Sequence, residues 1–349
     1  MSIALIDKLL KTRNLTRNEY TQLLTCTNEA ATLLHQHARA AANSIYGNKI
    51  FIRGLIEFTN HCKQNCYYCG LRNANKNLER YRLSIEQVLE CCRLGYEQGF
   101  RTFVMQGGED DFFTDDVLCD IISTIKHTYP DNAITLSIGE RTRESYQRLF
   151  DAGADRYLLR HETATDAHYA KLHPPHMSLE NRKKCLRTLK EIGFQVGCGF
   201  MVGSPGQTLE HIVDDLHFVI ELDPAMVGIG PFIAHTATPF AGVETSLANV
   251  QLQLTLNTLA ILRILKPNLL LPSTTALGSI HPQGRELGIL AGANVVMPNL
   301  SPPNTRKKYL LYENKIGTED NPANSRATIS ARLAEIGYEV VTARGDYIA

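Results

Sequence analysis

Residues 50–70 read IFIRGLIEFTNHCKQNCYYCG, a mostly apolar run followed by three closely spaced cysteines. The apolar part, 50–58, predicts a buried strand. Three residues separate Cys62 from Cys66, and two separate Cys66 from Cys69. Thiolates bind soft iron and zinc better than any other side chain. The stretch therefore predicts a metal or cluster site in a loop that directly follows a strand.

The number of thiols in this loop is informative. Structural zinc takes four protein ligands, whereas a site with three leaves one metal position open for a substrate. A ferredoxin-type 4Fe–4S cluster would need a fourth cysteine, and none follows nearby. The alternative is a zinc site with His61 as the fourth ligand. Because His61 is adjacent to Cys62, joint chelation of one ion by both is awkward, but the residues alone leave both interpretations open.

Composition limits the class of protein. A chain of 349 residues is long enough for one large barrel or two ordinary domains. Its 36 basic and 36 acidic residues cancel, so charge favours neither nucleic acid nor an anionic membrane as a partner. Nine cysteines, without a signal-peptide pattern near the N-terminus, indicate a reducing compartment. No apolar run approaches the ~18 residues of a membrane span. We expect a soluble, cytoplasmic protein.

Strand and helix patterns alternate along most of the chain. Strands are predicted at 50–58, 101–106, 133–138, 155–161, 195–202, 225–230, 270–275 and 293–297. Amphipathic helices are predicted at 84–97, 116–128, 179–192, 207–222 and 250–265. This alternation predicts an α/β fold, a complete (β/α)8 TIM barrel. We expect an N-terminal helical extension at 1–48, the barrel at 49–300, and a C-terminal tail at 301–349 that closes it.

Polar residues gather where the predicted strands end, which is where barrel enzymes carry their chemistry. Gly107 and Gly108 follow the second strand and would let the backbone come close to a ligand, although a tight turn explains them equally well. Arg160 and Glu162 share a face of the fourth strand. An arginine inside a barrel suits bidentate binding of a carboxylate, and a structural ion pair is the alternative. Arg182 is a second candidate for anion binding, although a solvated helix face is its default interpretation.

Hydroxyl groups mark three further places. Thr135 and Ser137 lie two residues apart on the third strand, so both can point into the barrel. Thr274 and Thr275 end the seventh strand. Tyr309 and Tyr312 are three residues apart and could share one helix face. They either pack against the barrel rim or line its cavity.

The spacing Cys-x3-Cys-x2-Cys, with Tyr68 before the last cysteine, resembles the radical S-adenosylmethionine (SAM) superfamily. In that superfamily three thiolates hold three irons of a 4Fe–4S cluster, and SAM chelates the fourth. Reduction cleaves SAM to methionine and a 5′-deoxyadenosyl radical. The Gly-Gly-Glu run at 107–109 resembles the one that binds the methionine amino group.

Several separate runs resemble the HydE family of FeFe-hydrogenase maturases, in the same order, from about residue 52 to residue 312. They are IEFTN (56–60), YCGLR (68–72), NLERYR (77–82), GED (108–110), RYLLRHET (156–163), MVGIGPFI (226–233), TTA (274–276) and GANVVMP (292–298). The resemblance implies a radical SAM enzyme of hydrogenase active-site maturation. The radical would act on a small iron–cysteine precursor held in the barrel. A flavodoxin- or ferredoxin-type reductant and other hydrogenase maturases are the implied partners.

The resemblance also implies a role for particular residues. The cluster ligands would be Cys62, Cys66 and Cys69. The SAM contacts would be Tyr68, Gln106, Gly107, Gly108, Glu162 and Arg182. The substrate cavity would be lined by Arg160, Thr135, Thr274, Thr275, Tyr309 and Tyr312. Some HydE proteins hold an auxiliary cluster with further C-terminal cysteines, but no cysteine follows Cys198 here, so we expect a single cluster.

Three alternatives remain on the sequence. Biotin synthase shares the barrel, but its second cluster needs thiols on several strands, and the second and third predicted strands have none. Methylornithine synthase is closer, and mainly the runs quoted above separate it from HydE. From another class, the chain could be a non-catalytic iron–sulfur carrier. A carrier needs no SAM site, so Gly107, Gly108 and the pair Arg160 and Glu162 disfavour it.

Overall fold

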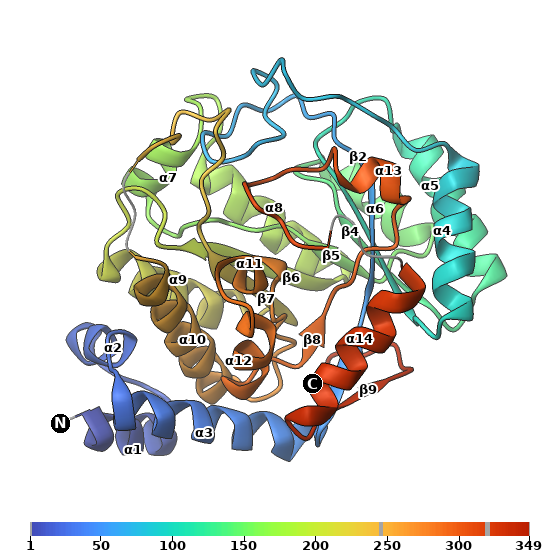
Figure 1. Ribbon diagram of the computed structural model, residues 1–349. Coiled ribbons are helices and arrows are strands. Elements are labelled where there is room, and N and C mark those ends of the chain that lie inside the picture. The colour runs from blue at the N-terminus through green and yellow to red at the C-terminus, as the bar shows by residue number, and fades with distance from the viewer. Residues whose placement is uncertain (1, 244–246, 318–321, 349) are drawn as a thin grey trace.

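A parallel six-stranded sheet forms the centre of the molecule (Figure 1). The structure is a computed structural model that describes residues 2–243, 247–317 and 322–348. The strands lie in sequence order, and each pairs with the next in parallel. They are β2 (Gly54–Thr59), β3 (Thr102–Gly107), β4 (Ala133–Ser137), β5 (Arg156–Leu158), β6 (Gln195–Val202) and β7 (Met226–Pro231). The predicted α/β class with a parallel sheet is confirmed.

A smaller parallel sheet has the strand order β8 (Val295–Val296), β1 (Lys49–Ile52), β9 (Glu339–Val341). Only Arg53 separates β1 from β2, so the predicted strand 50–58 runs through both sheets. The predicted strand 270–275 is wrong, because the segment makes only isolated parallel bridges at Leu270 and Pro272. Proline has no N–H to donate to a ladder, and Thr275 already begins helix α11 (Thr275–Ile280). Closure of a complete eight-stranded barrel therefore stays a prediction.

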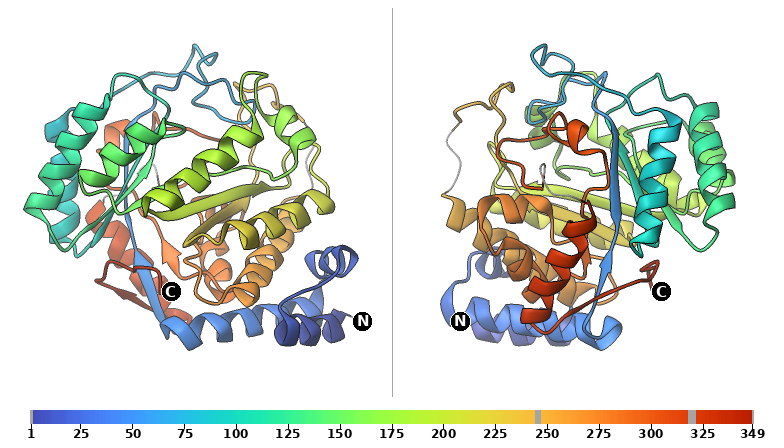
Figure 2. Two further views of the ribbon diagram at one scale, coloured as in Figure 1. Left: turned by 180° about the vertical axis from the view of Figure 1, so that it is seen from behind. Right: turned by 45° about the vertical axis from the view of Figure 1, so that its right-hand side comes forward.

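Helices cover the outer face of the larger sheet, as both views in Figure 2 show. They are α4 (Ile85–Glu97), α5 (Asp115–Thr128), α6 (Arg143–Asp151), α8 (Leu179–Ile192), α9 (Leu209–Leu222) and α10 (Ala248–Leu265). The five helices predicted from the sequence are all present. The capping box is confirmed too, since the Ser84 side chain accepts from the Gln87 N–H and the Gln87 side chain accepts from the Ser84 N–H. None of the helices in the described ranges is both long and apolar enough to cross a membrane.

The remaining helices lie near the two ends of the chain or in connections. At the N-terminal end are α1 (Ser2–Thr12), α2 (Arg17–Leu24) and α3 (Asn28–Tyr46), which pack against α10. The others are α7 (Asp166–Leu172), α12 (Gly284–Leu290), α13 (Pro303–Arg306) and α14 (Pro322–Glu335). Asn257 of α10 fixes the N-terminal part, because its side chain donates to the carbonyls of Leu24 and Cys26 at 2.9 Å.

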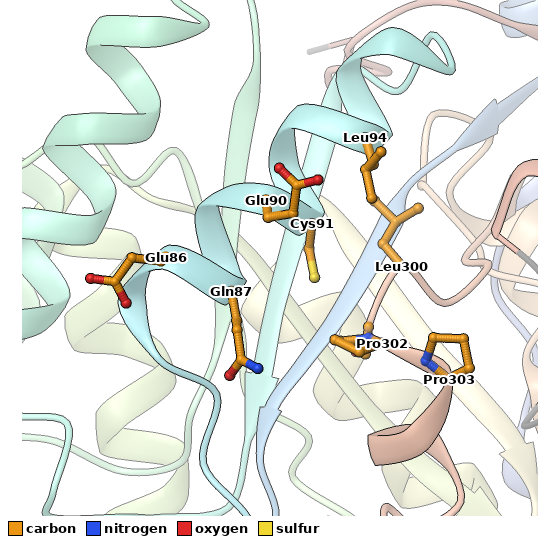
Figure 3. Close-up of a pocket in the computed structure, with 9 residues that line it drawn as sticks. Glu86, Gln87, Glu90, Cys91, Leu94, Leu300, Pro302 and Pro303 are labelled. Carbon is orange, nitrogen blue, oxygen red and sulfur yellow. The ribbon is translucent and has the colours of Figure 1, made fainter.

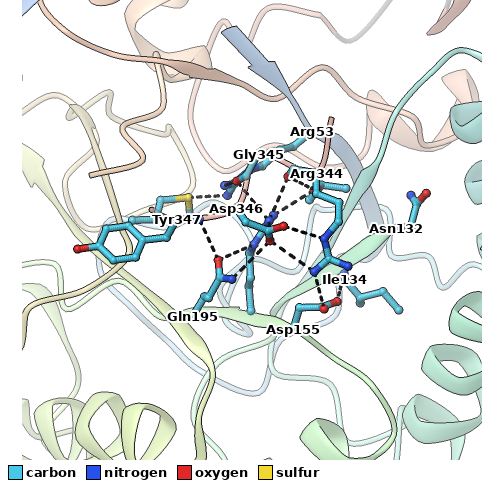
Figure 4. A network of polar contacts seen from close by, with 12 residues as sticks. Arg53, Asn132, Ile134, Asp155, Gln195, Arg344, Gly345, Asp346 and Tyr347 are labelled. Atoms are coloured by element: carbon cyan, nitrogen blue, oxygen red, sulfur yellow. Dashed lines mark hydrogen bonds and ion pairs between the residues drawn. The ribbon is translucent and has the colours of Figure 1, made fainter. Parts of the chain in front are cut away.

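Residues 344–346 lie at the amino-terminal end of the sheet, where they contact Arg156 at the start of β5 (Figure 4). The buried Arg156 donates to the carbonyls of Arg344 and Gly345 and to the Asp346 carboxylate, at 2.6 Å for the last. Arg344 in turn pairs with Asp155 at 2.9 Å. The division into 1–48, 49–300 and 301–349 stays a prediction, and residues 1, 244–246, 318–321 and 349 of those ranges lie outside the described residues.

Candidate active site

A cavity of about 320 Å³ lies at the carboxyl ends of the strands. Its wall combines residues from the larger sheet, from the loop that carries the cysteines and from the segment 309–315. Many residues predicted from the sequence meet there: Tyr68, Cys69, Gln106, Gly107, Arg160, Glu162, Arg182, Thr274, Thr275, Tyr309 and Tyr312. Four predicted residues are not part of this lining, namely Cys62, Cys66, Gly108 and Thr135.

Thr135 lies deeper than the cavity. It is buried on β4 beside Arg156 of β5, near the amino-terminal end of the sheet. Ser137, two residues further along the same strand, lines the cavity in its place. The alternation of side chains along a strand predicted the shared direction of the two residues, but it does not give their depth in the barrel.

The cysteine loop is held on three sides by backbone hydrogen bonds. The N–H of Lys63 donates to the carbonyl of Glu109, that of Tyr67 to Leu172, and that of Gly70 to Leu311, each at 2.9 Å. Gly108 lies directly against the first cysteine. A Cβ at position 108 would come within 2.6 Å of the Cys62 Cβ and 2.2 Å of the His61 carbonyl oxygen. Position 108 therefore needs glycine because the two loops pack so closely.

The three thiols of the loop, Cys62, Cys66 and Cys69, are all free. Within the described part of the chain, no three Cys, His, Asp or Glu side chains are grouped closely enough to hold one ion. A cluster does not require such a group, because each thiolate binds a different iron. Burial, followed by the charge of Cys62, raises the pKa of the Cys69 thiol to about 12. Binding to iron would therefore have to displace the thiol protons.

Arg160 and Glu162 face one another in the cavity wall with unused hydrogen-bonding capacity. Their Nη2 and Oε2 atoms are 3.2 Å apart, which is an ion-pair distance. Yet Nε and Nη2 of Arg160 and Oε2 of Glu162 are buried and make no hydrogen bond to the described residues. Oγ1 of Thr274 is also buried and also makes no hydrogen bond to the described residues. Buried polar atoms are nearly always bonded, so these atoms indicate the place of a polar ligand.

The backbone at Glu162 has an uncommon conformation, with a φ of 65°. A non-glycine residue in this region is rare and is concentrated at functional sites. Burial raises the pKa of the Glu162 carboxyl, and the nearby guanidinium groups of Arg160 and Arg182 oppose that shift. Arg182 is already paired, since its Nε lies 2.5 Å from Glu140 Oε1 and its Nη1 donates to the Arg160 carbonyl at 2.8 Å.

Tyr309 and Tyr312 both line the cavity, but they do not share a helix face. The helix α13 ends at Arg306, and both tyrosines lie in the irregular segment beyond it. The spacing of three suggested a helix because periodicity cannot distinguish a helix from an irregular segment over so few residues. Gln106 Nε2 donates to the Tyr309 hydroxyl at 3.3 Å, and burial raises the pKa of Tyr312 to about 12.

Sequence analysis missed two charged residues of the wall, Glu57 and Lys315. Lys315 Nζ lies 2.5 Å from Glu57 Oε1, and the two side chains are 7% and 1% exposed. Asn299 donates to the other carboxylate oxygen of Glu57 at 2.7 Å. A signal was present, because Glu57 is an acidic residue inside an otherwise apolar strand. Lys315 has no comparable signal in the sequence.

A separate groove of about 450 Å³ lies on the outside, between α4 and residues 300–303 (Figure 3). Apolar atoms make up nearly all of its surface, although Glu86 and Glu90 stand at its edge. It includes none of the residues predicted to act in chemistry. We assign it no part in the site.

Comparison with known proteins shows the family of this chain. The sequence pattern of the radical SAM superfamily matches residues 56–219. The chain is 50% identical over 270 residues to the FeFe hydrogenase maturase subunit HydE of Thermotoga maritima, with 77% of this chain and 76% of that protein covered. It is 26% identical to the 3-methylornithine synthase of Methanosarcina barkeri, with 91% and 89% covered. The crystal structure of methylornithine synthase (PylB) has a TM-score of 0.84 at 25% identity, covering 97% of both chains.

Fold, thiols and sequence pattern together define a radical SAM enzyme, a class that uses a 4Fe–4S cluster and SAM. The identity to the Thermotoga protein is more specific than this class. The chain belongs to the HydE family of FeFe-hydrogenase maturases.

Proposed function

We propose that this chain matures the active site of FeFe hydrogenase by acting on a small iron–cysteine species held in the cavity. The observation that carries the proposal is the set of buried, unbonded polar atoms on Arg160, Glu162 and Thr274, in a cavity that also includes Cys69. Such a wall suits a compact polar ligand held close to a cluster. The identity to a HydE maturase supports the choice of substrate class.

In this proposal Cys62, Cys66 and Cys69 hold a single cluster and leave one iron open for SAM. The SAM contacts are Tyr68, Gln106, Gly107, Gly108, Glu162 and Arg182. When bound, the reduced cluster supplies the electron that cleaves SAM to methionine and a 5′-deoxyadenosyl radical. A Cβ at position 107 or 108 would clash with Thr59 Cγ2 or with the His61 carbonyl oxygen, so glycine there lets the end of β3 pack directly against the cysteine loop.

The chain's own residues orient the substrate and exclude water. Arg160 offers its Nε, which makes no hydrogen bond within the described residues, to an anionic group of the substrate, beside the Nη2 that pairs with Glu162. Thr274, Thr275, Tyr309 and Tyr312 complete the substrate wall, and Thr135 supports it from below. Because a carbon radical reacts with nearly any neighbour, the target must be held in contact in a dry chamber. The difficult chemistry belongs to the cofactor.

We further propose that the two sheets close into a complete (β/α)8 barrel. Parallel bridges continue the ladder beyond β7, from Met226 to Leu270, from Pro272 to Val295 and from Leu55 to Asn299. Hydrogen bonds accompany them, such as Ser273 N–H to the Val295 carbonyl at 2.9 Å. These contacts support a closed ring in which the seventh strand is reduced to single bridges.

The partners and the compartment are also proposals. A radical SAM maturase takes a small-molecule substrate and a reductant. We propose a flavodoxin- or ferredoxin-type reductant and a further maturase that delivers the precursor. A reducing, cytoplasmic location is supported by the nine cysteines, which are all free thiols.

Hydrogenase activation in a defined mixture tests the function. The chain, anaerobically reconstituted with iron and sulfide, is added to the other maturation components and apo-hydrogenase, and hydrogen evolution is measured. We expect activation that depends on this chain. No activation by a chain that cleaves SAM would refute the proposed function.

The variant Arg160→Ala tests the substrate clamp. We expect it to retain SAM cleavage to 5′-deoxyadenosine while hydrogenase activation is lost, because the anionic group of the substrate has lost its partner. Arg143→Ala is the matched control, since its ion pair with Glu191 lies on the surface. Activation by Arg160→Ala at the level of the control would refute the clamp.

A further inference from the structure

The turn at residues 160–164 directs alternate side chains to opposite sides. Arg160 and Glu162 line the cavity, whereas His161 is fully buried away from it, between the rings of Phe200 and Phe218. There His161 meets Asp215 of helix α9, with Nε2 and Oδ1 3.2 Å apart. Both side chains are 0% exposed. Neither residue was singled out by sequence analysis.

Asp215 binds the turn at two points. Its Oδ1 contacts His161 and also accepts from the N–H of Ala164 at 2.5 Å. The bonded positions, 161 and 164, stand on either side of Glu162. The second oxygen, Oδ2, is buried and makes no hydrogen bond within the described residues. Within the described residues, every hydrogen bond of this carboxylate therefore goes to the turn that carries Glu162.

His161 extends the contact to the sheet. Its Nδ1 accepts from the N–H of Gly199 at 3.4 Å, which leaves Nε2 as the nitrogen that donates to Asp215. Burial raises the pKa of the Asp215 carboxyl and lowers that of the His161 imidazole. Only Oδ1 of Asp215 is bonded, and it accepts both of its bonds, so the amide oxygen of Asn at position 215 can take its place.

Two consecutive residues of α8 hold the same turn from another side. Arg182 donates to the carbonyl of Arg160 at 2.8 Å, and Lys183 donates to the carbonyl of Ala164 at 3.0 Å. Helix α8 therefore binds the turn at positions 160 and 164, and helix α9 binds it at positions 161 and 164. The left-handed φ of Glu162 is strained for a residue with a side chain and persists only where its surroundings enforce it.

We propose that Asp215 and His161 are positioning residues that hold Glu162 in its left-handed conformation and so direct its carboxylate into the cavity. This inference rests on the proposed function in one respect, namely that Glu162 contacts SAM. The alternative is a polar pair that only stabilises the core. Burying polar groups costs free energy unless they are bonded, and Asp215 uses its bonds solely on this turn.

The test measures SAM affinity without turnover. Wild type and variants are reconstituted anaerobically with iron and sulfide, and the dissociation constant of SAM is measured by equilibrium dialysis at equal iron content. Melting temperatures are measured in parallel. We expect Asp215→Ala to weaken SAM binding about tenfold or more. We expect Asp215→Asn to restore it to within about threefold of wild type, because the amide oxygen can accept both bonds.

Asn257→Ala is the matched control. Asn257 is buried, and its side chain joins α10 to the N-terminal helices by hydrogen bonds that lie away from the cavity. We expect a lower melting temperature with SAM affinity unchanged. If Asp215→Ala does not fold, His161→Phe removes the same bond between aromatic neighbours, and we expect its SAM binding to weaken severalfold. The inference is overturned if the folded variants bind SAM like wild type, or if Asn257→Ala weakens binding equally.

Failure of this inference is distinct from failure of the proposed function. SAM affinity is measured without hydrogenase or substrate. A chain that binds SAM through a correctly held Glu162 but activates no hydrogenase would contradict the proposed function and leave the positioning role in place.

Discussion

The ion pair of Glu57 with Lys315 is the most deeply buried pair of opposite charges in the cavity wall. Its side chains are 1% and 7% exposed, whereas Arg160 is 33% exposed beside Glu162. Lys315 also donates to the carbonyl of Tyr309 at 2.9 Å and lies 4.8 Å from the centre of the Tyr309 ring. One pair therefore joins strand β2 to the segment that carries both tyrosines.

Replacing Lys315 tests how much this ion pair contributes to the free energy of unfolding. Lys315→Met leaves the Glu57 carboxylate buried without its cation, so we expect a loss of about 3–5 kcal/mol in the free energy of unfolding. The double variant Glu57→Gln, Lys315→Met should lose less than the single one. Lys63→Met is the control, because its pair with Asp111 is exposed and worth under ~1 kcal/mol. Urea unfolding of all three under anaerobic conditions would contradict the account if Lys315→Met resembled Lys63→Met.

The buried His168 gives the stability a dependence on pH. Its Nδ1 has no hydrogen-bond partner within the described residues, and its ring stacks on His211 with centroids 4.8 Å apart. Burial, and then the charge of His211, lowers the pKa of His168 from 6.5 to about 4. His168 therefore binds a proton below about pH 6.5 in the unfolded chain, but only below about pH 4 in the folded chain. Stability from this group is complete above pH 6.5 and is lost as pH falls.

His168→Asn removes this titration. Wild type should lose about 2 kcal/mol of unfolding free energy through His168 between pH 7 and pH 5. In the variant, the difference between these two pH values should shrink by about that amount. His127→Asn removes an exposed imidazole and is the matched control. An equal pH dependence in wild type and His168→Asn would show that His168 is not desolvated.

At the scale of elements, the segment 308–316 connects the cysteine loop to the substrate wall. Asn60 Nδ2 donates to the carbonyl of Lys308 at 2.8 Å. The N–H of Gly70 donates to the carbonyl of Leu311 at 2.9 Å. On its other side the Glu313 N–H donates to the Ala234 carbonyl at 3.1 Å. This irregular segment thus spans the cavity and places Tyr309, Tyr312 and Lys315 in its wall.

Gly70→Ala tests the close packing of this segment on the cysteine loop. A Cβ at position 70 would come within 2.2 Å of the Leu310 carbonyl oxygen and 2.4 Å of His235 Cδ2. Such overpacking costs about 1–3 kcal/mol. We expect that loss in urea unfolding, together with less iron retained after reconstitution. Gly228→Ala is the control, since its nearest neighbour would be 3.9 Å away. Equal stability and iron content in the two variants would contradict the packing described here.

For the whole molecule, the sequence predicted the elements that rest on local pattern. The parallel sheet and its helices follow from apolar runs and helical periodicity, and the cysteine loop follows from spacing within eight residues. Contacts between distant residues left no such pattern. Lys315 meets Glu57 across 258 residues of chain, and Arg156 meets the Arg344 carbonyl across 188. A full strand was predicted at 270–275, where only single bridges form, because an apolar pattern does not show that Pro272 lacks an N–H.

The candidate site was predictable where chemistry needs a particular residue type. Thiols, adjacent glycines and the Arg160–Glu162 pair carry their own signal, and the structure brings most of them to one cavity. Depth could not be predicted, so Thr135 was expected in the cavity and Ser137 occupies the lining instead. The support that His161 and Asp215 give to the turn could not be predicted either. A single histidine after a strand and a single aspartate in a helix carry no signal that they meet.

The central claim is that three thiolates hold a cluster with one iron left open for SAM. The most direct measurement is electron paramagnetic resonance of the reduced, anaerobically reconstituted chain with and without SAM, combined with metal analysis. The account predicts four irons per chain, a cluster signal that changes when SAM is added, and loss of that signal and of 5′-deoxyadenosine formation in Cys66→Ala. Zinc in place of iron, or a cluster signal that SAM does not alter, would contradict it.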